Sequence, residues 1–509
     1  MLGPPKPRRL DEPIAVSLEA LVPTDHFYRH LDRCLDLGFV RELVRAAYAD
    51  RGRPGVDPVV FFKLQLVMFF EGVRSERQLL RLAADRLSVR WYLGYGIDEP
   101  LPDHSSLSRI RARYGLTVFR RFFEEVIERC VQAGLVWGRE LYVDGTMVEA
   151  NAAVDSMRPR FTIEAHLADL FAGAPPEPLE AAAGPSRPAP APLPLELTEE
   201  ARAALSERAA GRHGWLDHDG RPDRSRTSGP YRRTADYRAS PTDPDASPLR
   251  PTGGRARLGY HVHYVVDGGR ARTVLAALVT PAEVQDNQPM LDLLWHARFR
   301  WKLRLRQATG DTKYGTVENV VGIENQGIRA YVPLPDVEAR KPGFFGTSAF
   351  TYDRTEDLFR CPGGEELPFR KHRFDVRLRV YQAPAAACNA CGLKPRCTGG
   401  TTGRQVARHL DEAYLDRVRG YREIEAYQKA IRKRKVWVEP LFAEAKDWHG
   451  LRRFRLRGLR KVNGEALLVA AGQNLKRLLS HRGWGRRPWP GGGAGLVLPV
   501  VLPAPAGLG

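Results

Sequence analysis

The stretch Leu141-Tyr142-Val143-Asp144 decides how the middle of this sequence folds. Three apolar residues followed directly by a carboxylate predict a short buried strand that ends at an acidic side chain. Further strand patterns follow at 260–266, 273–279 and 328–332, and an amphipathic helix is expected at 288–300. Strands that alternate with a helix in this way predict a core of the α/β class.

The sequence before this strand is predicted to be helical. Asp57 and Pro58 supply an N-cap and a first-turn proline for a strongly apolar helix at 59–70. Ser75 begins a capping box, which opens a second helix at 76–87. We therefore expect an α-helical N-terminal domain.

A third cap, Asp103 or Ser105, precedes a short helix that carries Arg109, Arg111 and Arg113. Two short helices joined by a turn, the second of them basic, are typical of a helix-turn-helix-like DNA-binding domain, in which Arg109 and Arg113 would contact DNA. A helical dimerisation or packing domain fits the pattern equally well. The pattern alone does not distinguish these two functions.

The charge of the chain points to a polyanionic partner. With 79 Lys and Arg against 60 Asp and Glu, the 509 residues carry a formal charge of +19. Nucleic acid is the first expectation and an anionic membrane the second. No apolar run approaches the ~18 residues that span a bilayer, and no secretory signal is evident, so we expect a cytoplasmic protein.

Two segments are expected to stay outside the core. Residues 175–194 hold eight prolines, and residues 211–256 are rich in Arg, Asp, Ser, Gly and Pro. Composition of this kind cannot offset the entropy lost on ordering, so a largely flexible insertion is predicted at about 172–255. The Gly- and Pro-rich tail at 484–509 is predicted to be disordered.

Three acidic residues belong to three predicted core elements. Asp144 ends the first strand, Asp311 follows the segment 306–310, and Glu439 lies in a helical pattern. Phosphoryl transfer assisted by two divalent cations needs such a set of oxygen ligands, and Mg²⁺ prefers carboxylates. A single acid would more often cap a turn, so the prediction depends on the combination.

These residues and their neighbours resemble the DDE transposases of bacterial insertion sequences, whose catalytic core has an RNase H-like fold. The likeness extends from about residue 26 to residue 479, and its motifs occur in the family's order. They lie at 101–106, 143–146 with 149–151, 242–246 with 259–260, 279–282 with 286–287, 310–315, 439–446, 457–462 and 473–477.

The resemblance implies an α/β fold in which a helix-turn-helix-like helical domain precedes an RNase H-like core with a mixed sheet. Insertions, one of them a four-Cys knuckle, interrupt this core. The expected divisions are 1–135 for the helical DNA-binding domain, 136–171, 256–335 and 406–483 for the core, 172–255 and 336–405 for the insertions, and 484–509 for the tail.

The resemblance also implies that Asp144, Asp311 and Glu439 are catalytic and hold two Mg²⁺ or Mn²⁺ ions. The family's signature has a basic residue seven positions after the third acid, which is Lys446 here. Seven residues at about 100° each bring Lys446 to within about 20° of Glu439 on a helix. Glu444 is rotated well away, which favours Glu439 as the metal ligand.

Basic residues surround the third acid. The signature's upstream arginine, four positions before Glu439, is a lysine here, which keeps the charge but loses bidentate phosphate contact. Basic runs are usually solvated helix faces, but in a chain of charge +19 we expect these to contact DNA phosphates. The candidates are Lys446, Lys435, Arg432, Arg453, Arg455 and Arg457.

Four of the six cysteines cluster in the sequence, at Cys361, Cys388, Cys391 and Cys397. Four thiolates suffice for a closed tetrahedral zinc site, and related transposases carry a similar cysteine-bearing insertion. A structural Zn²⁺ is therefore predicted. The alternative is four reduced cysteines in a loop.

The implied function is binding of an element's terminal inverted repeats, followed by Mg²⁺-dependent strand cleavage and transfer into target DNA. The implied assembly is a homo-oligomer, a dimer on DNA, in a nucleoid-associated protein without membrane contact. Two alternatives remain: an RNase H-like nuclease that cuts without joining, and a non-catalytic DNA-binding protein such as a decayed transposase.

Overall fold

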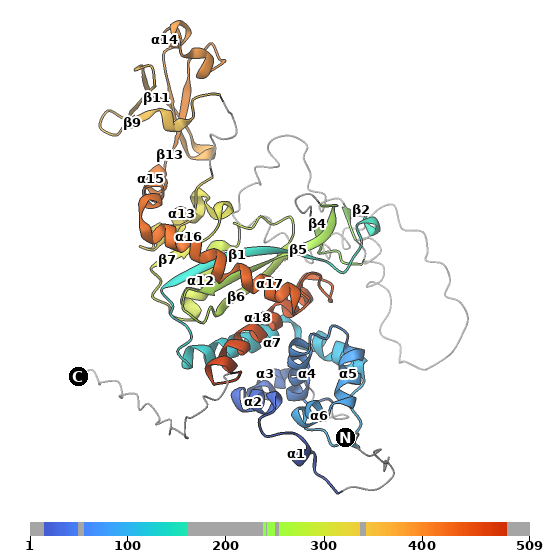
Figure 1. Cartoon of the computed structure of the whole chain (residues 1–509). Helices are drawn as coiled ribbons and strands as arrows, with labels where there is room; N and C mark the ends of the chain where they lie inside the picture. Colours follow the sequence, from blue (N-terminus) through green and yellow to red (C-terminus); the bar gives the residue numbers. More distant parts are fainter. Residues whose placement is uncertain are drawn as a thin grey trace, which may run out of the picture.

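The computed structural model describes residues 15–48, 55–159, 238–240, 242–249, 254–335 and 343–485. Three parts follow one another in Figure 1: a helical region, a central sheet with its helices, and a smaller distal sheet. This arrangement confirms the predicted mixed α/β class with a helical N-terminal region. Most of the predicted flexible insertion and residues 486–509 of the predicted tail lie outside the described residues.

The helical region confirms two predicted helix starts. Asp57 caps the helix that follows by accepting a hydrogen bond from the Val59 amide at 2.8 Å, and Ser75 caps the next helix. The strongly apolar helix that Asp57 caps is buried along most of its length, as its sequence predicts. The helices are α1 (Leu18–Leu21), α2 (Phe27–Cys34), α3 (Phe39–Val44), α4 (Pro58–Phe70), α5 (Glu76–Asp85) and α6 (Leu87–Leu93).

The basic segment is the short helix that the sequence predicts, and it ends at Gly115, whose backbone is not helical. It forms the first part of α7 (His104–Gln132), a span of 29 residues that Asp103 caps as predicted. The span is kinked at Gly115, whose φ of 62° lies outside the helical region. Beyond the kink a second helical stretch follows because apolar residues such as Phe119 and Phe122 are buried in the core.

Within the part of the chain that the structure describes, the central sheet has six strands. Strand β5 has β1 on one side and both β4 and β6 on the other, all antiparallel to it. Strands β7 and β8 extend the sheet beyond β1 and run parallel to it. The strands are β1 (Glu140–Glu149), β4 (Ser247–Leu249), β5 (Arg257–Asp267), β6 (Val274–Pro281), β7 (Gln307–Thr309) and β8 (Arg329–Tyr331).

The predicted end of the first strand of this sheet is wrong. Strand β1 continues past Asp144 to Glu149, because β5 is long enough to pair with it as far as Gly259. The apolar run gives only the first half of this strand. Strand β4 lies inside the range expected to be flexible, and it pairs with the start of β5.

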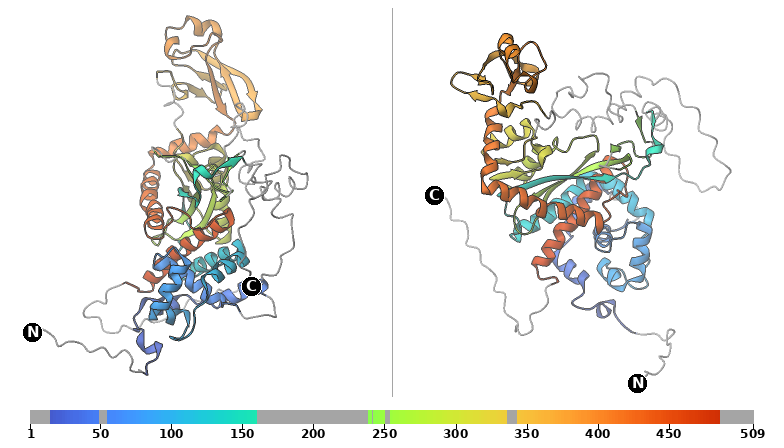
Figure 2. Two further views of the ribbon diagram at one scale, coloured as in Figure 1. Left: turned by 90° about the vertical axis from the view of Figure 1, so that its right-hand side faces the viewer. Right: turned by 45° about the horizontal axis from the view of Figure 1, so that its top comes forward.

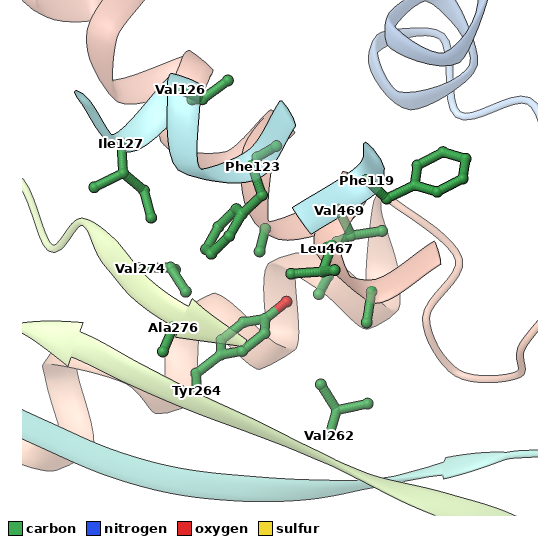
Figure 3. Packing of buried hydrophobic residues seen from close by; sticks show 14 of the residues in the cluster. Phe119, Phe123, Val126, Ile127, Val262, Tyr264, Val274, Ala276, Leu467 and Val469 are labelled. Carbon is green, nitrogen blue, oxygen red and sulfur yellow. The ribbon is translucent and has the colours of Figure 1, made fainter. Parts of the chain in front are cut away.

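Helix α18 (Leu459–His481) joins the sheet to the helical region. It packs against β6 on one side and against α7 and α4 on the other. Figure 3 shows this layer, in which Phe119 and Phe123 of α7 meet Leu467 and Val469 of α18 close to Ala276 of β6. The continuous apolar core therefore fixes the helical region to the sheet.

The C-terminal helical pattern divides into several elements. The sequence predicts long helices at about 410–448, whereas the structure has α15 (Glu412–Gly420), α16 (Glu425–Trp437) and α17 (Glu439–Asp447). The break between α16 and α17 falls at Val438, with Pro440 in the first turn of α17. Two further helices, α12 (Met290–Arg300) and α13 (Val317–Glu324), follow strands of the central sheet.

The described residues of the cysteine-bearing segment form an antiparallel sheet of five strands. It has a small core of its own, which includes Phe359, Leu367 and Tyr381. Figure 2 shows this distal sheet at one end of the molecule, beyond α15. Its elements are β9 (Thr351–Asp353), β10 (Leu358–Arg360), β11 (Glu366–Arg373), β12 (Leu378–Gln382), α14 (Ala385–Ala390) and β13 (Gln405–His409).

The distal sheet is anchored where the chain returns from it. Arg417 of α15 forms an ion pair with Glu324 of α13 at 3.2 Å, and Tyr414 bonds to the neighbouring Asn325. Tyr421 also donates to Glu324, at 3.2 Å. None of the described helices combines the length and apolarity needed to cross a membrane.

Candidate active site

Two of the three predicted acids lie on neighbouring parallel strands. Tyr142 of β1 pairs with Thr309 of β7. Two residues further along each chain, Asp144 and Asp311 therefore arrive at the same end of the strand pair. Asp144 is buried, whereas Asp311 is partly exposed and accepts a hydrogen bond from the Lys313 amide at 2.8 Å.

The third predicted acid, Glu439, lies at the start of α17. Its negative charge acts on the pKa of the first acid, Asp144. Burial raises the pKa of Asp144 to about 6, and the negative charges of Asp311 and Glu439 add to this shift. Arg434 and the Gly145 amide act in the opposite direction. The fold thus brings together three carboxylates from three separate segments, with Asp144 as the buried member.

Arg434, which no local sequence pattern distinguishes from its basic neighbours, bridges two of these carboxylates. Its Nη1 lies 2.6 Å from Oδ2 of Asp144, and its Nη2 lies 3.3 Å from Oε1 of Glu439. Arg432 and Lys435, the predicted residues on either side, are exposed. The run of four basic residues does not single out one of them; the turn from α16 into α17 decides which one meets the acids.

Lys446 lies on the side of α17 that faces β1, whereas Glu444 faces α18. Lys446 donates a hydrogen bond of 2.6 Å to Thr146, two residues after Asp144. Glu444 is held instead by groups on and near α18, including Lys476 and Arg477. The two acids of α17 therefore have different surroundings, and only Glu439 is near Asp144.

A fourth acid, Asp286, positions Lys313 beside the candidate site. Its Oδ2 accepts a hydrogen bond of 2.6 Å from Lys313, and its Oδ1 lies 3.2 Å from Nδ1 of His261. The bond to Asp286 raises the pKa of Lys313, and the charges of Asp311 and Asp144 contribute to the shift. Asp286 thereby keeps a cationic side chain beside two of the three carboxylates.

Two segments of the chain match known families. Residues 16–113 match the family model described as Transposase domain (DUF772), and residues 360–479 match the one described as Transposase DDE domain. Both models describe transposase domains, and together they support an insertion-sequence DDE transposase. No curated protein and no solved structure gives a significant match.

The two matches cover the ends of the transposase and leave its middle unmatched. The first spans the helical region as far as the basic part of α7. The second begins in the distal sheet, ends in α18 and includes Glu439, Arg434 and Lys446. Asp144 and Asp311 lie in neither matched range, so the fold is what relates them to Glu439.

The acids of the transposase suit a divalent cation in chemistry, although they are not arranged around one. Within the described ranges, no group of three or more His, Cys, Asp or Glu side chains is placed to hold a metal ion. The carboxylates of Asp144 and Glu439 instead share the guanidinium of Arg434. The positively charged guanidinium of Arg434 therefore lies between hard oxygen donors, which are the ligands that Mg²⁺ prefers.

Two of the predicted DNA-contact arginines lie beside the end of β1. Glu149 forms a parallel bridge with Arg453, whose Nε bonds to the Ala150 carbonyl at 3.1 Å. Arg457 bonds to the Asn151 carbonyl at 3.0 Å, and both arginines are exposed. Together with Lys446 they make a basic row along β1 that leads away from Asp144.

A third arginine of this group, Arg455, points into the protein. It forms an ion pair of 3.1 Å with Glu76, which also pairs with Arg111 of α7. The side chain of Arg455 is 18% exposed, so this residue links the helical region to the core instead of offering a free charge. Arg109 and Arg113, in contrast, are exposed on α7.

The four clustered cysteines of the transposase line one cavity in the distal sheet domain. All four are free thiols or thiolates. Backbone amides lie close to three of the sulfurs: Glu365 N to Cys361 Sγ at 3.3 Å, Leu393 N to Cys391 Sγ at 3.4 Å and Arg404 N to Cys388 Sγ at 3.3 Å. Amide donors stabilise negative charge on sulfur.

Proposed function

We propose that this transposase binds the terminal inverted repeats of its element and catalyses DNA strand cleavage and strand transfer with Asp144, Asp311 and Glu439. The observation that carries the proposal is the meeting of these acids around the buried end of the β1 and β7 pair, although they lie far apart in sequence. Hydrolysis of the element's end comes first, and the freed 3′-hydroxyl then attacks target DNA. Both steps are in-line displacements at phosphorus, so one site serves both.

The acids and the neighbouring cations divide the work. Two divalent cations held by the three carboxylates would activate the attacking oxygen and stabilise the leaving oxygen. Asp144, as the buried ligand, fixes the position of the site, while Glu439 is 53% exposed and can adjust to DNA. Lys446 and Lys313 place positive charge on either side of the acids, where it would partly neutralise the negative charge of the phosphate.

The central sheet is proposed to be the RNase H-like core implied by the family resemblance. Its order supports this proposal: three antiparallel strands, β6, β5 and β1, are followed by the parallel strands β7 and β8. The acids of β1 and of the segment after β7 then share one end of adjacent strands. This arrangement gives a metal-dependent site a rigid base.

DNA is proposed to follow the basic row of Lys446, Arg453 and Arg457 along β1. Arg109 and Arg113 on the exposed side of α7 are proposed to contact the terminal repeats, with Arg432 and Lys435 as further phosphate contacts. Arg455 is left out of this surface because it is paired with Glu76. A dimer on DNA would let two such sites act on the two ends of the element.

The cysteine cavity is proposed to hold one structural Zn²⁺. The support is the common cavity and the three amide groups close to sulfur. Four thiolates form a closed site that leaves no position for a reacting ligand, so the ion would stabilise the distal fold without taking part in catalysis.

A strand-joining assay tests the function. The full chain is incubated with Mg²⁺, supercoiled plasmid and an oligonucleotide that ends at the element's cleaved terminal repeat. Covalent joining of the oligonucleotide to the plasmid is expected, and the Asp144→Asn variant should bind the oligonucleotide without joining it. Nicking without joining would favour a nuclease, and binding without either product would favour a DNA-binding protein.

A further inference from the structure

Both carboxylate oxygens of Asp144 have partners. Oδ1 accepts a hydrogen bond of 2.9 Å from the Gly145 amide, and Oδ2 contacts Arg434 at 2.6 Å. The amide belongs to the backbone of a paired strand and cannot move away on its own. Any cation that approaches Asp144 therefore competes with Arg434, the partner whose side chain can rotate.

Arg434 lies where a cation bound between the acids would lie. Its side chain is 13% exposed and its two terminal nitrogens reach two different acids, one buried and one exposed. A carboxylate as buried as Asp144 is costly to leave unpaired, and an arginine in the same site repels an incoming divalent cation. The same guanidinium therefore stabilises the metal-free protein and opposes metal binding.

We propose that Arg434 is the built-in counter-ion of the metal-free site and is displaced from Asp144 when a divalent cation binds. Metal loading is then an exchange of one cation for another, in which Arg434 acts as a positioning residue. It keeps the acids from moving apart and delays occupation of the site. This inference rests on the proposed metal-dependent function of the three acids.

The test is a titration of the full-length protein with Mn²⁺ in the absence of DNA. Binding is measured by calorimetry or by the loss of the paramagnetic resonance signal of free Mn²⁺. Arg434→Gln should bind Mn²⁺ about tenfold more tightly than the unsubstituted protein, which is the effect of removing one charge-assisted hydrogen bond from the competition. The same variant should melt at a lower temperature in EDTA. It should also gain more in melting temperature from Mn²⁺.

Lys429→Gln is the matched control, because it removes one positive charge from an exposed position of the same helix. It should change neither the Mn²⁺ affinity nor the melting temperature appreciably. Arg434→Lys, which keeps the charge but cannot reach both acids with a planar fork, should lie between Arg434→Gln and the unsubstituted protein. This second variant covers the case in which Arg434→Gln does not fold.

The two possible failures have different signatures. If Arg434→Gln bound Mn²⁺ more weakly or with unchanged affinity, the counter-ion role would be wrong. If Asp144→Asn bound Mn²⁺ as well as the unsubstituted protein does, the metal site itself would be misplaced and the proposed function would fail first. Tighter binding by Arg434→Gln together with weaker binding by Asp144→Asn supports both.

Discussion

The side-chain amide of Asn474 is paired with the backbone of Val274 in both directions. Its Oδ1 accepts from the Val274 amide at 2.8 Å, and its Nδ2 donates to the Val274 carbonyl at 2.8 Å. Asn463, three turns earlier in α18, makes the same pair of bonds with Val279. The two asparagines cover the edge of β6 that would otherwise present unpaired polar groups.

Replacing Asn474 with leucine should destabilise the transposase strongly. The substitution keeps the size of the side chain but leaves the buried amide and carbonyl of Val274 unpaired, at a cost of about 2–4 kcal/mol. Chemical denaturation should show this loss in the free energy of unfolding. Asn389→Leu, at an exposed site in the distal domain, should change stability little; an equal loss there would argue against edge pairing as the cause.

Neutralising the acids should abolish chemistry but not DNA binding. Asp144→Asn, Asp311→Asn and Glu439→Gln each remove a charged ligand while keeping the shape of the side chain, so strand joining should fall by orders of magnitude. Binding that rests on Lys and Arg should persist or tighten, because repulsion of phosphate decreases. Gel shifts and joining assays on the same preparations separate the two effects, and unchanged joining in all three variants would refute the proposed site.

Glu444 should contribute to stability and not to cleavage. Burial acts to raise its pKa, but hydrogen bonds from His449 and Lys476 and the charge of Arg477 outweigh this and lower it to about 2 from 4.5. A lowered pKa means that the stabilisation, on the order of 3 kcal/mol, is present above about pH 4.5 and is lost as the pH falls towards 2.

The free energy of unfolding should therefore fall more steeply between pH 5 and pH 2.5 in the unsubstituted protein than in Glu444→Gln. Glu423→Gln, at an exposed position, should keep the steep slope. Loss of strand cleavage in Glu444→Gln at neutral pH, with Glu439→Gln still active, would reverse the assignment of the third acid.

Gly145 should not tolerate a side chain. A Cβ at this position would lie 3.1 Å from Nδ1 of His263, 3.3 Å from Oδ1 of Asp286 and 3.4 Å from the Tyr314 hydroxyl. A methyl group among these buried polar atoms should displace β1 at Asp144, so Gly145→Ala is expected to lower strand joining by about 10- to 100-fold. Gly420→Ala, where none of the described residues lies within 4 Å, is the control for a glycine loss without crowding.

The cysteine cavity should release its metal when two ligands are removed. Elemental analysis of the purified protein should find one zinc per chain, and Cys388→Ser with Cys391→Ser should eliminate it and lower the melting temperature. Cys34→Ser changes a buried cysteine outside the cavity and should retain the zinc. A fully folded, metal-free protein would contradict the zinc proposal.

Much of the central fold follows from local sequence signals. The caps at Asp57, Ser75 and Asp103 start helices as predicted, and the apolar runs at β5 and β6 form strands. The full extent of β1 could not be predicted, because its second half is stabilised by pairing with β5. The distal strands β9–β13 are short and largely exposed, so their apolar alternation is too weak to identify them.

Local sequence signals predict the candidate site only in part. The family resemblance relates Asp144, Asp311 and Glu439, which lie in distant segments of the chain. The roles of Arg434 and Asp286 cannot be predicted locally, because they depend on contacts across the fold: a helix break that turns Arg434 towards Asp144, and a loop that brings Asp286 to Lys313. Arg455 shows the opposite error, because an exposed-looking basic run conceals an internal ion pair with Glu76.

The anchoring of α15 on α13 makes the distal sheet a removable module. Arg417 and Tyr421 hold Glu324, and Tyr414 holds Asn325, immediately before the chain enters β8. The central sheet is thus closed by contacts that do not pass through the distal domain, which has a separate core. A deletion that joins the end of β8 to α15 through a short linker is therefore expected to leave the central sheet folded.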